Sequence, residues 1–129
     1  ASAVNCIVAQ RLARRICSEC VADDPEVEFQ QVVDAGLREE EARSFKAKRG
    51  QGCSNCSDTG FKGRVAIYEV MVMTDQLKEF VLNGASSAEV KREAIRGGMV
   101  TLRRSALNKM LEGVTTISEV FRVSASDSI

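Results

Sequence analysis

The feature that most constrains the fold of this 129-residue chain is a pair of C-x-x-C motifs. Cys17 and Cys20 form the first and Cys53 and Cys56 the second, with 32 residues (21–52) between them. Each spacing lets two sulfurs of one tight turn point at a common centre, so the two motifs together supply four thiolates. The sequence has no histidine, so a metal site built here is all sulfur. We predict a closed, tetrahedral zinc site that clamps the two motifs together and performs no catalysis.

Other interpretations of the cysteines stay open at this point. A mononuclear iron centre uses the same ligands, although aromatic residues make up only 5% of the chain. Redox catalysis needs a cysteine with a lowered pKa at the start of a helix, whereas we expect Cys17 at a helix end. Structural disulfides conflict with a cytoplasmic chain, and a metal-free set of four cysteines is the remaining option. We expect the fifth cysteine, Cys6, to be a buried thiol inside the first helix.

The size and charge of the chain limit the classes of protein to which it can belong. The length suits one compact unit or a piece cut from a larger one. Lys and Arg total 18 and Asp and Glu total 18, which gives a formal net charge of +0 and lacks the basic excess typical of nucleic-acid binding. The longest apolar stretch, 65–73, is far shorter than the ~20 residues of a membrane span. The start shows neither a basic leader nor an apolar signal, so we predict a cytoplasmic location.

Periodicity and capping signals predict the helices of the first half. Apolar residues at three- and four-residue steps indicate an amphipathic helix over 2–16. Asp24 as a cap and Pro25 at the first helical position indicate a second helix that ends before Gly36. With a short charged helix over 38–45, it forms an insert between the two cysteine pairs.

The second half begins with a loop and a strand and is otherwise helical. A glycine-rich loop over 50–63 precedes the best strand candidate, 64–72. Capping residues Thr74, Ser86 and Thr116 then indicate a series of helices. These helices are expected over 75–82, 90–96, 102–112 and 120–123, followed by a frayed tail over 124–129.

The predicted fold is therefore mainly α with a small β element. It consists of a tetracysteine zinc-knuckle subdomain and a C-terminal helical bundle, with the division placed between 1–72 and 73–129 inside one compact unit. Because metal binding and folding are coupled, removal of zinc should loosen the insert while the C-terminal helices survive.

Four sequence segments, in this order, resemble one protein family. The segments are residues 9–20 (AQRLARRICSEC), 52–69 (GCSNCSDTGFKGRVAIYE), 98–102 (GMVTL) and 113–123 (GVTTISEVFRV). They are similar to the C-terminal end of the type II secretion and type IV pilus assembly ATPases, the GspE/PilB family, with the pilus-assembly branch preferred.

The resemblance implies a cytoplasmic, hexameric motor peripheral to the inner membrane, which hydrolyses ATP to assemble pilins or pseudopilins through an inner-membrane platform protein. It implies that the chain is a fragment of a RecA-like motor ATPase. It also implies that the four paired cysteines bind zinc, while the phosphate-binding loop, the acidic residues of the Mg²⁺ site and the histidine box lie upstream. ATP and Mg²⁺ then belong to the parent protein only. The chain itself has no nucleotide-binding or catalytic motif, so alone it is not a complete enzyme.

Arg11 and Arg64 are the candidates for contacts across such an assembly, because a guanidinium binds phosphate or carboxylate in a fork. The alternative for each is a local ion pair with a residue such as Glu69. The alternative function is an autonomous zinc-ribbon module whose basic stretch, 11–15, binds nucleic acid or protein. Neutral net charge and few aromatic residues argue against nucleic acid.

Overall fold

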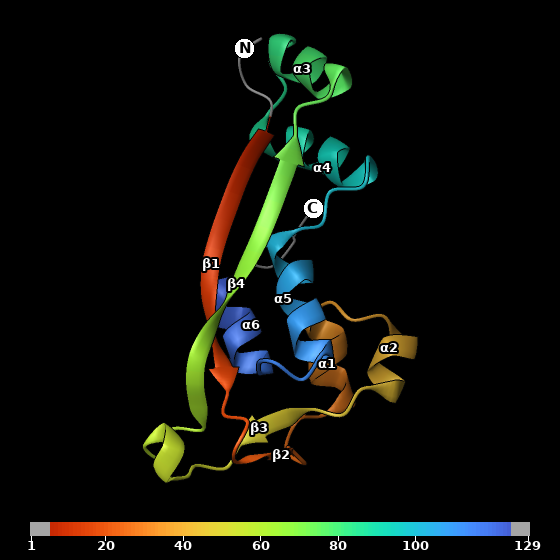
Figure 1. Ribbon diagram of the computed structural model, residues 1–129. Helices are drawn as coiled ribbons and strands as arrows, with labels where there is room; N and C mark the ends of the chain where they lie inside the picture. Colours follow the sequence, from red (N-terminus) through yellow and green to blue (C-terminus); the bar gives the residue numbers. More distant parts are fainter. Residues whose placement is uncertain (1–5, 125–129) are drawn as a thin grey trace.

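The computed structural model describes residues 6–124, and a long antiparallel ribbon of two strands is its main feature (Figure 1). The strands are β1 (Cys6–Ile16), β2 (Val21–Asp23), β3 (Lys48–Gly50) and β4 (Phe61–Val72). Strand β1 pairs with β4 from Cys6 opposite Val72 to Ile16 opposite Phe61, with an irregularity between Arg14 and Ile16. Strands β2 and β3 form a second, short antiparallel sheet next to the Ile16 end of the ribbon.

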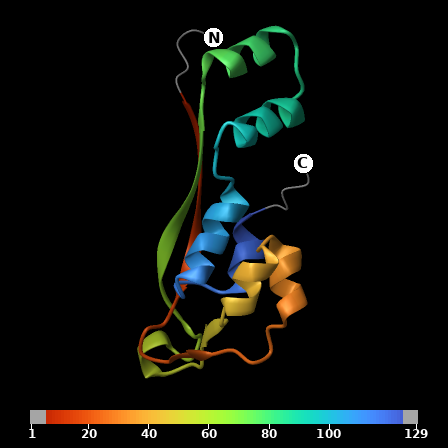
Figure 2. The same cartoon turned by 90° about the vertical axis from the view of Figure 1, so that its right-hand side faces the viewer.

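Six α-helices follow or interrupt these strands. They are α1 (Phe29–Ala35), α2 (Glu39–Ser44), α3 (Asp75–Leu82), α4 (Ser87–Arg96), α5 (Leu102–Leu111) and α6 (Ile117–Val123), with a single 3₁₀ turn, η1 (Ser54–Cys56), in the loop before β4. In Figure 2 the helices lie on one side of the ribbon, and the other side of the ribbon carries none of them.

The prediction of a helix over 2–16 is wrong, because its described part is strand β1. Val8, Leu12 and Ile16 are four residues apart, and a step of four falls on one face of a strand as well as on one face of a helix. The β-branched pair Ile7 and Val8 favours the strand, and pairing with β4 decides between the two. Of the described residues, 43% are helical and 24% lie in strands, so the mainly α class is also wrong.

The strand predicted over 64–72 is confirmed, and β4 begins three residues earlier, at Phe61. The helix predicted from Pro25 ends before Gly36 as expected, but its predicted start is wrong. Asp24 does accept a hydrogen bond, from the backbone N–H of Glu26 at 3.0 Å, but this closes a turn, and α1 begins only at Phe29. Pro25 therefore sits in a turn, which its fixed φ suits equally well.

The capping residues were predicted correctly. The hydroxyls of Thr74, Ser86 and Thr116 each accept a hydrogen bond from a backbone N–H of the first turn of α3, α4 and α6. Ser86 and Glu89 form the full capping box. The predicted tail over 124–129 lies almost entirely outside the described residues.

The expected C-terminal helical bundle is not present as one unit. Helices α5 and α6 pack with the insert helices α1 and α2 against the ribbon, whereas α3 and α4 pack on each other at the Val72 end (Figures 1 and 2). We call the first group the helical core. Its buried apolar residues are Ala13, Val32, Ala35, Leu37, Ala42, Ile67, Ala106, Leu107, Met110, Val120 and Val123.

A buried arginine ties the helical core together. Arg103 on α5 is only 6% exposed, and its guanidinium donates to the carbonyl oxygen of Ala35 (3.1 Å) and to the hydroxyl and carbonyl oxygens of Ser124 (2.8 and 3.1 Å). It also lies 4.9 Å from the ring centroid of Phe121. Helices α1, α5 and α6 are thus joined by one side chain, which satisfies carbonyl groups that the helix ends leave free.

Candidate metal centre

The two C-x-x-C motifs meet at one end of the ribbon, which we call the cysteine end. The first motif directly follows β1, and the second lies in the loop before β4, around η1. Because β1 and β4 are antiparallel partners, the end of one strand and the start of the other are neighbours. Two backbone hydrogen bonds fix the motifs further, from Cys17 N to Gly60 O (2.9 Å) and from Gln51 N to Cys20 O (3.1 Å).

The four sulfur atoms have the spacing of a tetrahedral metal site. Sγ–Sγ distances are 3.8 Å between Cys17 and Cys53, 3.9 Å between Cys20 and Cys56, and 3.7 Å between Cys53 and Cys56. All four ligand atoms lie within 4.8 Å of one another. A zinc–sulfur bond of about 2.3 Å gives a tetrahedron with edges of about 3.8 Å. The geometry of this cysteine cluster (Cys17, Cys20, Cys53 and Cys56) therefore fits one zinc ion.

Hydrogen-bond donors surround the cysteine cluster. Cys56 Sγ accepts from the backbone N–H groups of Cys53 (3.3 Å) and Gly60 (3.2 Å), and Cys20 Sγ accepts from that of Gly52 (3.3 Å). The side-chain amide of Asn55 points at Cys17 Sγ, with 3.7 Å between nitrogen and sulfur. Such donors stabilise thiolates and orient the ligands, as the outer shell of a metal site does.

The pKa values of the thiols reflect these donors unequally. Burial raises the pKa of Cys56, but the N–H groups of Cys53 and Gly60 outweigh it and bring the pKa to about 6. Burial also raises the pKa of Cys17, and hydrogen bonds from Glu19 and Asn55 more than offset this, so the net shift is downward. Burial raises the pKa of Cys20 to about 11 against the opposing N–H of Gly52. A metal that binds all four sulfurs must therefore displace at least one proton, and its affinity falls as pH is lowered.

Two glycines allow the second motif to dock so closely. A Cβ atom on Gly50 would lie 2.0 Å from the carbonyl oxygen of Gly60, which no side chain tolerates. Gly60 also has a φ of 80°, a conformation that side-chain-bearing residues rarely adopt. The backbones of β3 and the η1 loop thus cross in direct contact, which places Gly60 N against Cys56 Sγ.

The cluster has the composition of a structural site. Cys17 and Cys56 are buried and the other two cysteines are half-buried, so little sulfur surface is left for a substrate. With four protein ligands the tetrahedron is complete, and no position remains for the water that catalytic zinc requires. None of the five cysteines forms a disulfide, and Cys6 is exposed on β1, so its predicted burial is wrong.

Arg11 and Arg64 lie elsewhere and are not brought together. Arg11 is opposite Ile67 on the ribbon, and its guanidinium donates to the carbonyl oxygen of Gln10 at 3.2 Å. Arg64 is opposite Arg14 and, by strand alternation, lies on the other face. Neither pairs with Glu69, whose carboxylate instead accepts from the backbone N–H of Leu102 at 2.8 Å.

Glu119 on α6 has a role that the sequence did not reveal. Glu119 is 1% exposed, and its carboxylate accepts from the backbone N–H of Arg14 (2.7 Å) and from the guanidinium groups of Arg14 (3.1 Å) and Arg122 (2.7 and 2.8 Å). The hydrogen bond and charge of Arg122 lower the pKa of Glu119 to about 2, with a further contribution from Arg14. In the sequence, only the spacing of Glu119 and Arg122 indicated an ion pair, because Arg14 is far away along the chain.

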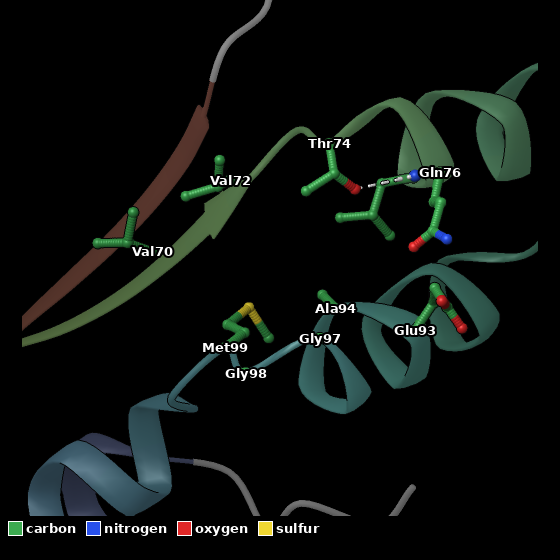
Figure 3. Close-up of a pocket in the computed structure, with 10 residues that line it drawn as sticks. Val70, Val72, Thr74, Gln76, Glu93, Ala94, Gly97, Gly98 and Met99 are labelled. Atoms are coloured by element: carbon green, nitrogen blue, oxygen red, sulfur yellow. Dashed lines mark hydrogen bonds between the residues drawn. The ribbon is translucent and has the colours of Figure 1, made fainter.

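A groove lies at the opposite end of the ribbon, between β4 and the α3–α4 pair (Figure 3). Its volume is about 340 Å³, and its lining includes Val70, Val72, Leu77 and Met99. Glu93 is the charged residue of this lining, and it is already paired with Arg96. The groove therefore has a mixed polar and apolar lining, and it shares no residue with the cysteine cluster. Within residues 6–124, no helix has the length and apolar character needed to cross a membrane.

Comparisons with known proteins agree with the family resemblance of the four sequence segments. The family model described as type II/IV secretion system protein matches residues 1–122. The chain is 49% identical, over 98% of its length, to the type IV pilus assembly ATPase PilB of Myxococcus xanthus, and 39% identical, over 95%, to PilB of Pseudomonas aeruginosa. It is 32% identical, over 98% of its length, to type II secretion system protein E of Aeromonas hydrophila. The chain spans only 22%, 21% and 24% of these three relatives.

Proposed function

We propose a function from the premise that this chain belongs to the type II/IV secretion system protein family. In this proposal the chain is the zinc-binding structural and interaction region of an ATPase that powers type IV pilus assembly. The higher identities to pilus assembly ATPases, 49% and 39% against 32% for a type II secretion protein, support the pilus branch. ATP and Mg²⁺ are bound by the rest of the parent protein, because the chain has no phosphate-binding loop and spans under a quarter of these relatives.

The sulfur geometry is the observation that carries the metal part of the proposal. Cys17, Cys20, Cys53 and Cys56 would hold one zinc ion, and the ion would supply cross-linking and no bond-making chemistry. Its role is to join the start of β4 to the end of β1 and to the β2–β3 sheet. The neighbouring N–H donors of Gly52 and Gly60 would hold the thiolates in place.

The remaining parts of the proposal concern the assembly. The parent would be a cytoplasmic hexamer peripheral to the inner membrane, with its other subunits and an inner-membrane platform protein as partners. Arg11 and Arg64 remain the proposed contacts across subunit boundaries, and both guanidinium groups belong to exposed residues of the ribbon. The division between 1–72 and 73–129 likewise stays a proposal.

Metal content and ATP hydrolysis test the proposal together. The full-length protein, purified without added metal, should contain about one zinc per chain by elemental mass spectrometry and should hydrolyse ATP. Cys53→Ser should lose the zinc, whereas Cys6→Ser is the matched control, because Cys6 lies outside the cysteine cluster, and should retain it. Equal zinc loss in both variants would contradict the ligand assignment. Full zinc content without ATP hydrolysis would contradict the motor assignment.

A further inference from the structure

The two C-x-x-C motifs differ in how they are held. Residues 53–60, which contain the second motif, make four backbone hydrogen bonds among themselves, with lengths from 2.8 to 3.5 Å. The first motif, 17–20, is fastened to this loop by the hydrogen bond from Cys17 N to Gly60 O at 2.9 Å. The second motif therefore has local structure of its own, and the first motif takes its position from the second.

Both sulfurs of the first motif accept hydrogen bonds from the segment that carries the second. Cys20 Sγ accepts from the backbone N–H of Gly52 (3.3 Å), and Cys17 Sγ accepts from the side-chain amide of Asn55, with 3.7 Å between Nδ2 and Sγ. Asn55 lies between the two cysteines of the second motif and 38 positions after Cys17. In the part of the chain that the structure describes, Asn55 is the residue outside the cysteine cluster whose side chain donates to a cluster sulfur.

The sulfur of Cys17 depends on donors from the protein, because Cys17 is 0% exposed. The backbone N–H of Glu19 is the second donor to this sulfur. If the amide of Asn55 were turned over, its oxygen would face the lone pairs of a thiolate, so a metal-bound cluster favours the N–H orientation. Asn55 itself is exposed. A substitution there therefore removes a donor from Cys17 and little buried surface from the fold.

Lys62 fixes the turn that carries Asn55. Its Nζ atom donates to the backbone carbonyl oxygen of Asn55 at 3.0 Å, which ties the turn to strand β4. A zinc ion with four thiolates has an excess of negative charge, and a cation next to the turn offsets part of it. The amide of Asn55 thus reaches Cys17 from a turn that is held by its own backbone bonds and by Lys62.

We infer that Asn55 is a positioning residue of the metal centre, whose amide holds Cys17 against the second motif and slows the release of the metal. This rests on the proposed function, in which the four cysteines of the cluster bind zinc. Release begins at the first motif, because the second keeps its local structure without help from the first. Removal of an outer-shell partner typically weakens a metal site by about 10- to 100-fold.

Transfer of zinc from the full-length protein to a chromogenic chelator, followed over time, tests this role. Asn55→Ala should release zinc at least about 10-fold faster than the wild type. Asn55→Asp should release it faster still, because the carboxylate keeps the shape of the side chain but faces a thiolate with a negative charge. Ser54→Ala is the matched control, because Ser54 is an exposed neighbour in the same turn, and its release rate should equal that of the wild type.

Two further measurements separate positioning from a loss of structure. In the cobalt-substituted protein, the thiolate-to-metal charge-transfer band of Asn55→Ala should move to lower energy, because a thiolate without its hydrogen bond donates electrons more readily. Brief alkylation during zinc release should label Cys17 of this variant before Cys53. A charge-transfer band at the wild-type position, or simultaneous labelling of both cysteines, would overturn the inference.

The failure of this inference is distinguishable from the failure of the proposed function. Wild-type protein that contains zinc, with equal release rates in Asn55→Ala, Asn55→Asp and Ser54→Ala, would retain the metal site and reject the role of Asn55. Wild-type protein without zinc would reject the metal site and this role together. Faster release from the two Asn55 variants of a protein that does not hydrolyse ATP would support the role of Asn55 and reject the motor assignment.

Discussion

The cysteine end and the helical core lie side by side but depend on different forces. The core buries eleven apolar side chains, and its stability therefore comes from the removal of apolar surface from water. The cysteine end is made of short strands, turns and glycines, and four sulfurs occupy its centre. If the proposed zinc site is correct, one region folds by hydrophobic burial while its neighbour depends on a bound metal.

The boundary between the two regions does not follow the sequence. Residues 24–47 lie between the two cysteine pairs, yet α1 and α2 pack in the helical core, and Arg104 on α5 forms an ion pair with Glu41 on α2 at 2.5 Å. Metal removal should therefore loosen less of the insert than its position in the sequence suggests. The loosened part should comprise β2, β3 and the loop around η1.

The largest expected effect is the loss of the metal. Chelation, or Cys56→Ser, should speed the hydrogen exchange of amides in residues 50–60 by on the order of 1,000-fold. The reason is that the cysteines cannot hold these loops together without a bound cation. Amides of α5 should lose much less protection. Hydrogen exchange with and without chelator measures both. Equal loss in α5 and in residues 50–60 would show that the two regions form one folding unit.

A cavity in the core should have the next largest effect. Leu107 is 1% exposed, and Leu107→Ala should lower the free energy of unfolding by about 3 kcal/mol, while zinc content stays at one per chain. Denaturant unfolding and elemental analysis measure the two outcomes. Leu82→Ala, at an 80% exposed position, is the control and should change stability by less than about 0.5 kcal/mol. Loss of zinc from Leu107→Ala would contradict this expectation, because it would show that the cysteine end depends on the packing of the helical core.

The Glu119 ion pairs join the core to β1 and should make stability depend on pH. The pKa of the Glu119 carboxyl group is about 2 in the fold, below its ordinary value of 4.5. The charged carboxylate therefore stabilises the fold above about pH 4.5, and this contribution is lost as the pH falls through 2. Glu119→Gln should cost about 2 kcal/mol at neutral pH, a reduced figure because both arginines are half-exposed. Between pH 4.5 and 2 the variant should lose less stability than the wild type.

Urea unfolding at several pH values measures this difference. Glu112→Gln is a suitable control, because its carboxylate is 54% exposed and makes only a surface ion pair. Glu41, with a pKa of about 2 set by Arg104, titrates in the same range, so a residual slope in Glu119→Gln is expected. Identical pH profiles for wild type and Glu119→Gln would refute the role assigned to Glu119.

The smallest expected effect is at the far end of the ribbon. Ser86 caps α4, and Ser86→Ala should cost about 1 kcal/mol, confined to the α3–α4 pair. Ser87→Ala, one residue into the helix, removes no cap and serves as the control. Faster exchange of α4 amides in Ser86→Ala alone is the expected result, and an effect on α5 of the same size would contradict the independence of this pair.

The sequence was sufficient where the signal is local. C-x-x-C spacing identified the cysteine cluster, and capping residues such as Thr74 and Ser86 marked helix starts, because these patterns act within four residues. It was insufficient for β1, since a four-residue step fits a helix and a strand equally. The contact of Glu119 with Arg14 joins residues 105 positions apart, and no local pattern encodes it.

The register of β1 and β4 also limits how the length of such chains can change. Ile67 points into the helical core and Tyr68 away from it, so one residue inserted into β4 would exchange the two faces along the strand. Single insertions or deletions within either strand should therefore be absent from functional chains of this kind. Length variation should gather in the turn between α3 and α4, which lies outside both strands of the ribbon and outside the helical core.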